Sequence, residues 1–418
     1  MEKTRKHPAW KMLILSCIFG GAAQGILISC AGLFIQPVCN ALGFGTGPFS
    51  TYLAIGAVFL LIGFPLAGKV MAKFPIKPLL VVCIVINCGG FMLYSQFTHL
   101  WMFYVSGLFM GLSSVIPAYM ISPLLVSNWF DSNQGMAMGI SRALSAMIGA
   151  VFSIIGGVII ETLGYQAGYL ILGATALVMM LPCAFMVVMS PEVLGLQPYR
   201  TKEESTKHEG APVETTGVSA SAALKSLPFI FMFATVFFMV CGGAFAPQIA
   251  GLVPALGYNM AQAGTFVSIF MVGSVLGSFV LGFLNDKLGV RNTMYVILAM
   301  GIGSILLLTI GAPVSTLLLI LGLLCFGMFS AAGGVQPPLI VSNMFGQKDY
   351  ATIFGVMQMS MSLAGIFATP VYGFILDTTG SFNMGLYGLA ALLVIGVVLT
   401  YISFKTYKRL WVNTSAPV

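Results

Sequence analysis

Twelve long apolar stretches, joined by short connections, dominate this chain of 418 residues. A membrane-spanning helix needs about 20 such residues, whereas a barrel strand needs about 10 of alternating polarity. Because the stretches are continuous, they predict helices and exclude an outer-membrane barrel. Only 7% of the residues are charged, against about a quarter in soluble domains, which excludes a water-soluble fold. The predicted spans are Trp10–Val38, Ser50–Met71, Pro78–Phe97, Leu100–Ser127, Gln134–Ile160, Ala167–Met189, Leu227–Leu256, Ala263–Leu284, Asn292–Ile310, Ser315–Val341, Ala351–Leu376 and Met384–Tyr407.

The positive charges fix the predicted orientation of these spans. Of the 18 Lys and Arg residues, all except Arg142 fall in the tails and loops of one membrane face. Cytoplasmic loops gather Lys and Arg, so we expect a multi-pass protein of the cell membrane with both termini in the cytoplasm. The net charge of +7 therefore faces anionic lipids of the bilayer, and we expect no nucleic-acid partner.

A polar segment divides the chain into halves that repeat each other. Residues 191–225 are rich in mixed charge and predict a flexible cytoplasmic linker between two six-helix bundles, residues 1–190 and 226–418. Pro123–Phe130 (PLLVSNWF) matches Pro338–Phe345 (PLIVSNMF) at the same place in each half. A parallel repeat of this kind lets two bundles rock about a central site, so the sequence predicts an all-α membrane protein with pseudo-symmetric bundles.

The loop after the eighth span carries a recognisable motif. It has the sequence GFLNDKLGVR, and its defining residues are Gly282, Asp286, Lys287, Gly289 and Arg291. This pattern resembles the loop signature of the major facilitator superfamily, and the resemblance extends over the whole chain. It implies a transporter that works by alternating access, in which the loop acts as a conformational switch. Asp286 could pair with Arg291 or cap a helix N-terminus.

The first half departs from this signature, and a second resemblance narrows the family. Ala72 stands where the signature has Asp, and Pro75 stands where it has Gly, so we expect the switch to depend on Asp286.

The stretch from Asn128 to Ile140 is similar to the monocarboxylate and oxalate/formate exchanger branch. That branch typically places cations in the eighth or eleventh span, and both spans lack them here.

Arg142 is the candidate substrate ligand. It lies inside the fifth predicted span, where a charge is costly and usually functional. No Asp or Glu lies deep in any span, so a travelling anion could be its counter-ion, and a guanidinium offers two parallel donors to a carboxylate. The alternative is that Arg142 snorkels toward the cytoplasm and reaches Asp131 or a carbonyl.

Other polar residues within the spans complete the predicted substrate site. In the superfamily the first, fourth, seventh and tenth spans line the cavity, and a buried amide favours the cavity over lipid. Either cavity lining or helix–helix hydrogen bonding explains each residue. The candidates are Gln24, Tyr119, Gln248, Gln336 and Gln358, the last being the repeat counterpart of Arg142.

These features predict a secondary or facilitative carrier of small organic anions, mono- or dicarboxylates, with exchange as the preferred mechanism. The alternative is an exporter of hydrophobic or drug-like compounds. The sequence contains no catalytic cluster within the spans, so we expect no enzyme, no cofactor and no metal. The eight cysteines form no metal-type spacing and are predicted to be packing residues. We expect the carrier to function as a monomer.

Overall fold

The computed structural model describes residues 7–200, 217–245, 249, 260–379, 382–408 and 410. These residues are helical apart from loops and two isolated bridges, Phe130 with Tyr199 and Gly217 with Gly346. The chain divides into two compact units, Met1–Pro212 and Val213–Val418.

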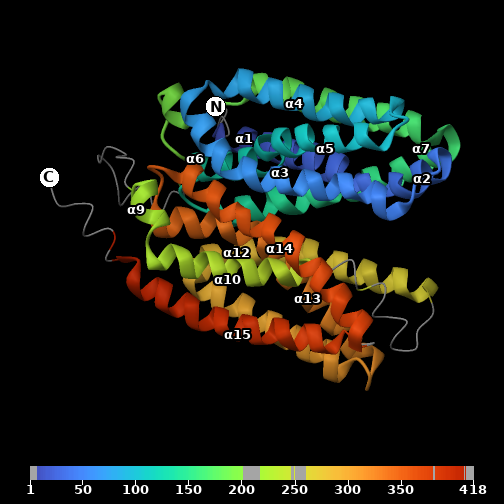
Figure 1. Cartoon of the computed structure of the whole chain (residues 1–418). Coiled ribbons are helices and arrows are strands. Elements are labelled where there is room, and N and C mark those ends of the chain that lie inside the picture. The colour runs from blue at the N-terminus through green and yellow to red at the C-terminus, as the bar shows by residue number, and fades with distance from the viewer. Residues whose placement is uncertain are drawn as a thin grey trace, which may run out of the picture. The chain divides into compact units, whose positions relative to one another are not determined.

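In the first unit the long helices run side by side along one direction (Figure 1). The first and fourth spans are each interrupted by a π-helical segment, η1 and η4. The elements are α1 (Ala9–Phe19), η1 (Gly20–Ile28), η2 (Ser29–Phe34), α2 (Ile35–Leu42), α3 (Thr46–Lys73), α4 (Ile76–Leu93), η3 (Tyr94–Gln96), α5 (Leu100–Ser114), η4 (Val115–Met120), α6 (Ile121–Trp129), α7 (Gln134–Met186) and η5 (Pro191–Leu194).

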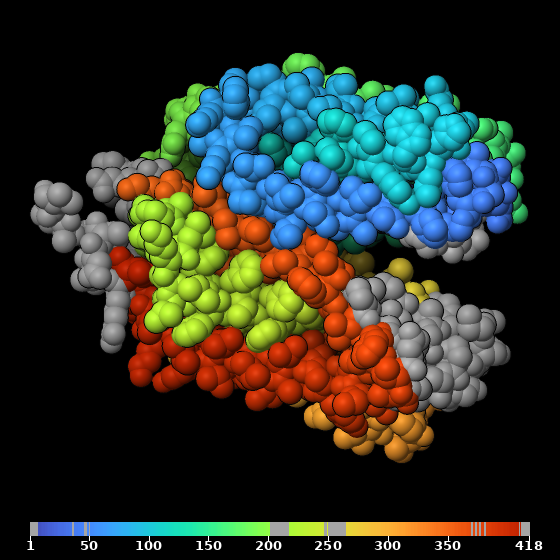
Figure 2. Space-filling model, viewed as in Figure 1, coloured from blue at the N-terminus to red at the C-terminus, as the bar shows by residue number. Residues whose placement is uncertain are grey.

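The second unit repeats this pattern, with its fourth span formed by one continuous α-helix, α13. The elements are α9 (Ala220–Leu224), α10 (Leu227–Gly243), α12 (Met260–Leu306), η7 (Leu307–Gly311), α13 (Thr316–Phe345), α14 (Tyr350–Thr379) and α15 (Asn383–Thr406). Helices α10 and α15 lie against each other, and their side chains close the space between them (Figure 2).

The predicted twelve membrane-spanning helices are confirmed within the described residues. Nine helices are long and apolar enough to cross a membrane. Two of the nine, α7 and α12, each consist of two helices that meet at a glycine with positive φ, Gly164 and Gly289. The shorter apolar helix α10 supplies the seventh span. Beyond Gly243, only Ala244, Phe245 and Ile249 of the predicted range belong to the described residues.

Small residues let the second and fourth spans of each unit cross closely. A Cβ atom on Gly111 of α5 would collide with the carbonyl oxygen of Gly56 on α3. At the related crossing of the second unit, a Cβ on Gly327 of α13 would collide with the carbonyl oxygen of Phe270 on α12. Because lipid tails are as apolar as leucine, this close contact is a main source of helix association.

The described ends of the predicted linker, residues 191–225, are packed against the chain. The Tyr199 amide donates to the carbonyl of Trp129 at 2.8 Å, and Arg200 forms a salt bridge with Asp131 at 2.7 Å. In the second unit the Val218 amide donates to the carbonyl of Phe345 at 2.9 Å. Each described end of the linker thus donates to a backbone carbonyl at the end of the fourth span of its unit. The last carbonyls of a helix have no partner within the helix, so the linker supplies one.

Replacing Gly111 with Ala tests the close crossing. We expect the free energy of unfolding to fall by about 1–3 kcal/mol, because the added methyl has no space beside Gly56. The measurement is the unfolding midpoint of the detergent-purified protein. Gly89→Ala is the matched control, because a Cβ at this helical position of α4 meets nothing within 4 Å. Equal midpoints for both variants would contradict the packing assignment.

Candidate functional site

Arg142 lies in the first half of α7, about two turns from its start at Gln134, and its side chain is half-buried. Its Nη1 donates a hydrogen bond to Oε1 of Gln24 at 2.9 Å. Gln24 is also half-buried and belongs to the first span. Two of the predicted site residues, separated by 118 positions, therefore form a direct contact.

The local structure of the first span explains this contact. Gln24 sits in η1, a π-helical segment of a kind that is often found at functional sites. Its neighbours are small, and a Cβ on Gly25 would lie only 2.8 Å from the Cα of Gly149 on α7. The glycines at this crossing allow the two backbones to approach closely, which places the Gln24 amide within reach of Arg142.

Tyr119 is the third predicted residue at this place. It lies in η4 of the fourth span, next to Pro117, and it is 6% exposed. The segment η4 packs against η1, which carries Gln24. The first and fifth spans thus bring an amide and a guanidinium into contact, and the phenol lies on the neighbouring segment of the fourth span. We call these three residues the Arg142 cluster.

A buried chain of serines lies beside the Arg142 cluster. Ser16 and Ser141, the residue before Arg142, are joined by their hydroxyls at 2.7 Å. Ser122 donates to the carbonyl of Ser16 at 2.8 Å. These bonds connect the first, fourth and fifth spans again and hold the helix that carries the guanidinium. The sequence analysis did not single them out, because serines in apolar runs most often bond their own helix.

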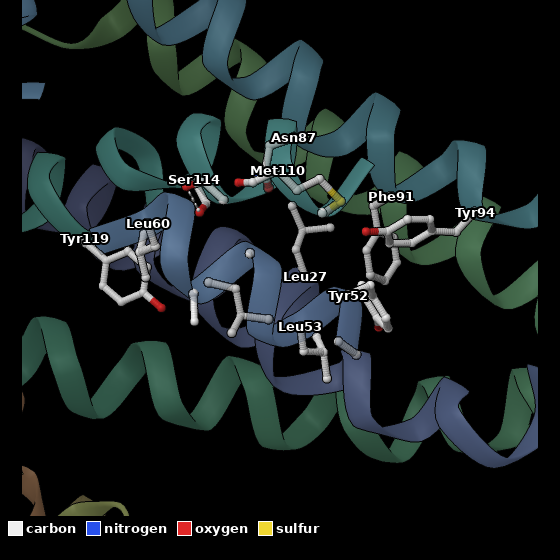
Figure 3. Close-up of a pocket in the computed structure, with 16 residues that line it drawn as sticks. Leu27, Tyr52, Leu53, Leu60, Asn87, Phe91, Tyr94, Met110, Ser114 and Tyr119 are labelled. Carbon is white, nitrogen blue, oxygen red and sulfur yellow. Dashed lines mark hydrogen bonds between the residues drawn. The ribbon is translucent and has the colours of Figure 1, made fainter. Parts of the chain in front are cut away.

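An elongated cavity of about 360 Å³ lies within the first unit. Tyr119 stands at one end of it, Tyr52 and Tyr94 stand at the other, and Asn87 lies between them (Figure 3). Asn87 is another residue that the sequence analysis missed. The available signal was a single amide in the middle of an otherwise apolar third span.

Asp131 has its own partner near the cytoplasmic end predicted for the fourth span. Its Oδ2 accepts from Nε of Arg200 at 2.7 Å, and both side chains are partly exposed. The structural alternative for Arg142 named this carboxylate or a backbone carbonyl as its partner. Arg142 donates a hydrogen bond to the neutral side chain of Gln24, and its role stays a prediction.

The remaining predicted ligands belong to the second unit. Gln336 on α13 is fully buried, and neither atom of its amide has a hydrogen-bond partner among the described residues. Gln358 on α14 is 2% exposed, and its Nε2 likewise has no partner there. Gln248 lies outside the described residues. The role of these three residues stays a prediction.

The predicted switch loop is a tight turn within α12. Gly289 has φ 76° and ψ 158°, a conformation that is essentially restricted to glycine. Asp286, Lys287 and Arg291 are exposed around it, and Lys287 lies 4.6 Å from the ring centre of Phe283. Gly282 is buried one turn earlier. In the first half Pro75, with φ −62° and ψ 134°, takes the place of Gly289. The switching role stays a prediction.

Gly289→Ala tests whether this turn requires glycine. We expect a loss of about 1–3 kcal/mol in stability, because an Ala at this φ and ψ is strained. Gly303→Ala, in the second half of the same helix, meets nothing within 4 Å and serves as the control. The readout is again the unfolding midpoint in detergent, and an unchanged midpoint for Gly289→Ala would exclude the strained turn.

In the part of the chain that the structure describes, long apolar helices form two repeated units, and one unit contains a cation and neutral polar groups; this arrangement defines a polytopic membrane protein. The chain matches the model of the Major Facilitator Superfamily over residues 17–368 and 231–417. It therefore belongs to this superfamily and is a membrane transporter.

Known proteins agree with this assignment. The fold matches that of the proton:xylose symporter XylE, bound to 6-bromo-6-deoxy-D-glucose, with a TM-score of 0.73, 13% identity and coverage of 96% of this chain and 99% of that chain. In sequence the chain is 24% identical over 339 residues to monocarboxylate transporter 12 of Mus musculus, covering 75% of this chain and 67% of that protein. It is 27% identical over 286 residues to the MFS-type transporter hasB of Aspergillus fumigatus, covering 66% of this chain and 61% of that protein.

Proposed function

We propose that this transporter carries small organic anions, mono- or dicarboxylates, and that Arg142 binds the carboxylate. The observation that supports this most directly is the half-buried guanidinium within the fifth span, which donates a hydrogen bond to the neutral amide of Gln24 at 2.9 Å. A hydrogen bond to Gln24 orients the guanidinium without cancelling its charge. The planar fork of donors then suits a carboxylate, which can accept two parallel N–H bonds.

The charge itself supplies a substantial attraction. At an effective dielectric constant of about 20, two opposite unit charges about 4 Å apart attract each other by about 4 kcal/mol. Part of this attraction offsets the desolvation of the anion. The same charge repels cationic compounds, which argues against a cation exporter. Similarity to monocarboxylate transporter 12 also supports a carboxylate substrate.

The proposed mechanism is alternating access with exchange of one anion for another. Proton-coupled carriers usually use an Asp, Glu or His within the membrane, and this sequence places none deep in a span. Exchange needs no such group, because the returning anion can accompany the change of conformation. We place the carrier in the cell membrane as a monomer with both termini in the cytoplasm, following the distribution of Lys and Arg.

Arg142 variants test the proposed carboxylate contact. We expect Arg142→Gln to lower carboxylate exchange roughly 10–100-fold, since a hydrogen bond to a charged group contributes about 1.5–3 kcal/mol. Arg142→Lys should retain part of the activity, because it keeps the charge but loses the fork. The measurement is counterflow in proteoliposomes with a panel of mono- and dicarboxylates. Lys405→Gln, at the end of α15, removes an exposed cation and serves as the control. Normal exchange by Arg142→Gln would remove Arg142 from the site.

Gln24→Glu tests whether the charge of Arg142 attracts the substrate, because it adds a competing carboxylate beside the guanidinium. The new carboxylate is the same size as the amide and should form an ion pair with Arg142. An internal anion then competes with the substrate, so we expect a marked rise in the KM for carboxylates in the counterflow assay. Gln96→Glu adds the same charge at an exposed position of η3 and is the matched control. Unchanged KM in Gln24→Glu would show that the charge of Arg142 does not attract the substrate.

A further inference from the structure

The turn between α3 and α4 concentrates positive charge at one end of the first unit. Helix α3 ends at Lys73 and α4 begins at Ile76, so only two residues connect these two apolar spans. Lys69, Lys73 and Lys77 are all exposed around the turn. Lys69 and Lys73 are four residues apart in α3, which places them on the same face of the helix. Because two membrane spans meet at this turn, its lysines lie at a membrane surface.

No side chain neutralises these lysines within the part of the chain that the structure describes. The salt bridge between Arg200 and Asp131 belongs to other segments of the first unit. The repeat shows what the turn lacks, because the first unit has the exposed Ala72 where the second unit has Asp286. Residues 69–77 therefore carry three positive charges and no negative one. An anion from outside the chain meets no carboxylate of the turn that competes with it.

An exposed apolar stripe on α3 leads to the lysines. Val58, Ile62 and Leu66 are between 43 and 47% exposed, and their spacing places them on the helix face that ends in Lys69 and Lys73. Phe74 follows at the turn itself and is 58% exposed. In a bilayer, acyl chains cover such a stripe, and an aromatic ring suits the boundary between acyl chains and headgroups. The lysines at the end of the stripe distinguish one lipid from another by the charge of the headgroup.

We infer that the turn between α3 and α4 is a binding site for an anionic phospholipid. Lys69 and Lys73 bind the phosphate, and Lys77 adds a third positive charge from the start of α4. The acyl chains lie along the apolar stripe and beside Phe74. Phosphatidylcholine carries its own cation next to the phosphate, so it has no net charge to offer the lysines. The site does not depend on which substrate is transported.

The test measures the binding of two lipids to the detergent-purified full chain by native mass spectrometry. The lipids are dioleoylphosphatidylglycerol and dioleoylphosphatidylcholine, and the quantity compared is the ratio of their Kd values for the first bound molecule. In the wild type we expect phosphatidylglycerol to bind about tenfold more tightly or better, since each lysine near an anionic surface contributes about fivefold. The double variant Lys69→Gln/Lys73→Gln should lower this preference about fivefold or more.

Two further comparisons isolate the site. Ala72→Asp adds the missing carboxylate at an exposed position and should lower the preference about fivefold, because it cancels the charge of one lysine. Ala72→Asn adds nearly the same volume without charge and should leave the preference unchanged. Lys225→Gln/Lys405→Gln removes two exposed cations from the second unit, so it controls for the change in net charge. The unfolding midpoint shows that each variant is folded.

Four outcomes would overturn the inference. The first is equal binding of the two lipids by the wild type. The second is an unchanged preference in both Lys69→Gln/Lys73→Gln and Ala72→Asp. An equally large loss in Lys225→Gln/Lys405→Gln would show that net charge alone causes the preference. Displacement of the bound lipid by an equal concentration of glycerol 3-phosphate would assign the turn to a free phosphate. None of these results bears on the proposed anion carrier, which the counterflow assay tests separately.

Discussion

Lipid offers no hydrogen bonds, and this constraint determines most of the structure. Every backbone group within the bilayer must be satisfied by the chain itself, so the spans are helices along nearly their whole length. A polar side chain among them must also find a partner, or its burial is costly. Arg142 satisfies this requirement with Gln24, and Asn87 satisfies only half of it, through its amide nitrogen. The proposed function starts from Arg142.

Close helix contacts decide which polar groups meet. Gly25 and Gly149 allow the first span to approach α7, and this approach brings Gln24 to Arg142. The interrupted fourth span contributes Tyr119 from η4. Small residues in the spans thus do more than pack helices together. They determine how closely Gln24 and Arg142 approach, although these residues lie 118 positions apart in sequence.

The internal repeat keeps the packing but changes the chemistry. Both units have a close crossing between their second and fourth spans, and both receive an end of the linker where the fourth span ends. Arg142 of the first unit is replaced by Gln358 in the second, and Gly289 of the second unit is replaced by Pro75 in the first. In the proposed mechanism the first unit therefore supplies the charge that holds the anion, and the second supplies the glycine turn of the switch loop.

The sequence by itself determined the twelve spans, the repeat and the single cation within them, because continuous apolar runs and loops without Lys or Arg on one face leave few other folds. It also named Gln24, Tyr119 and Arg142 as polar residues that need partners. Only the tertiary structure decided that Gln24 and Arg142 meet, that the described ends of the linker are packed, and that Asn87 lines a cavity. The physical reason is that an apolar run shows that a polar residue must be satisfied, whereas the crossing of distant helices determines which atom satisfies it.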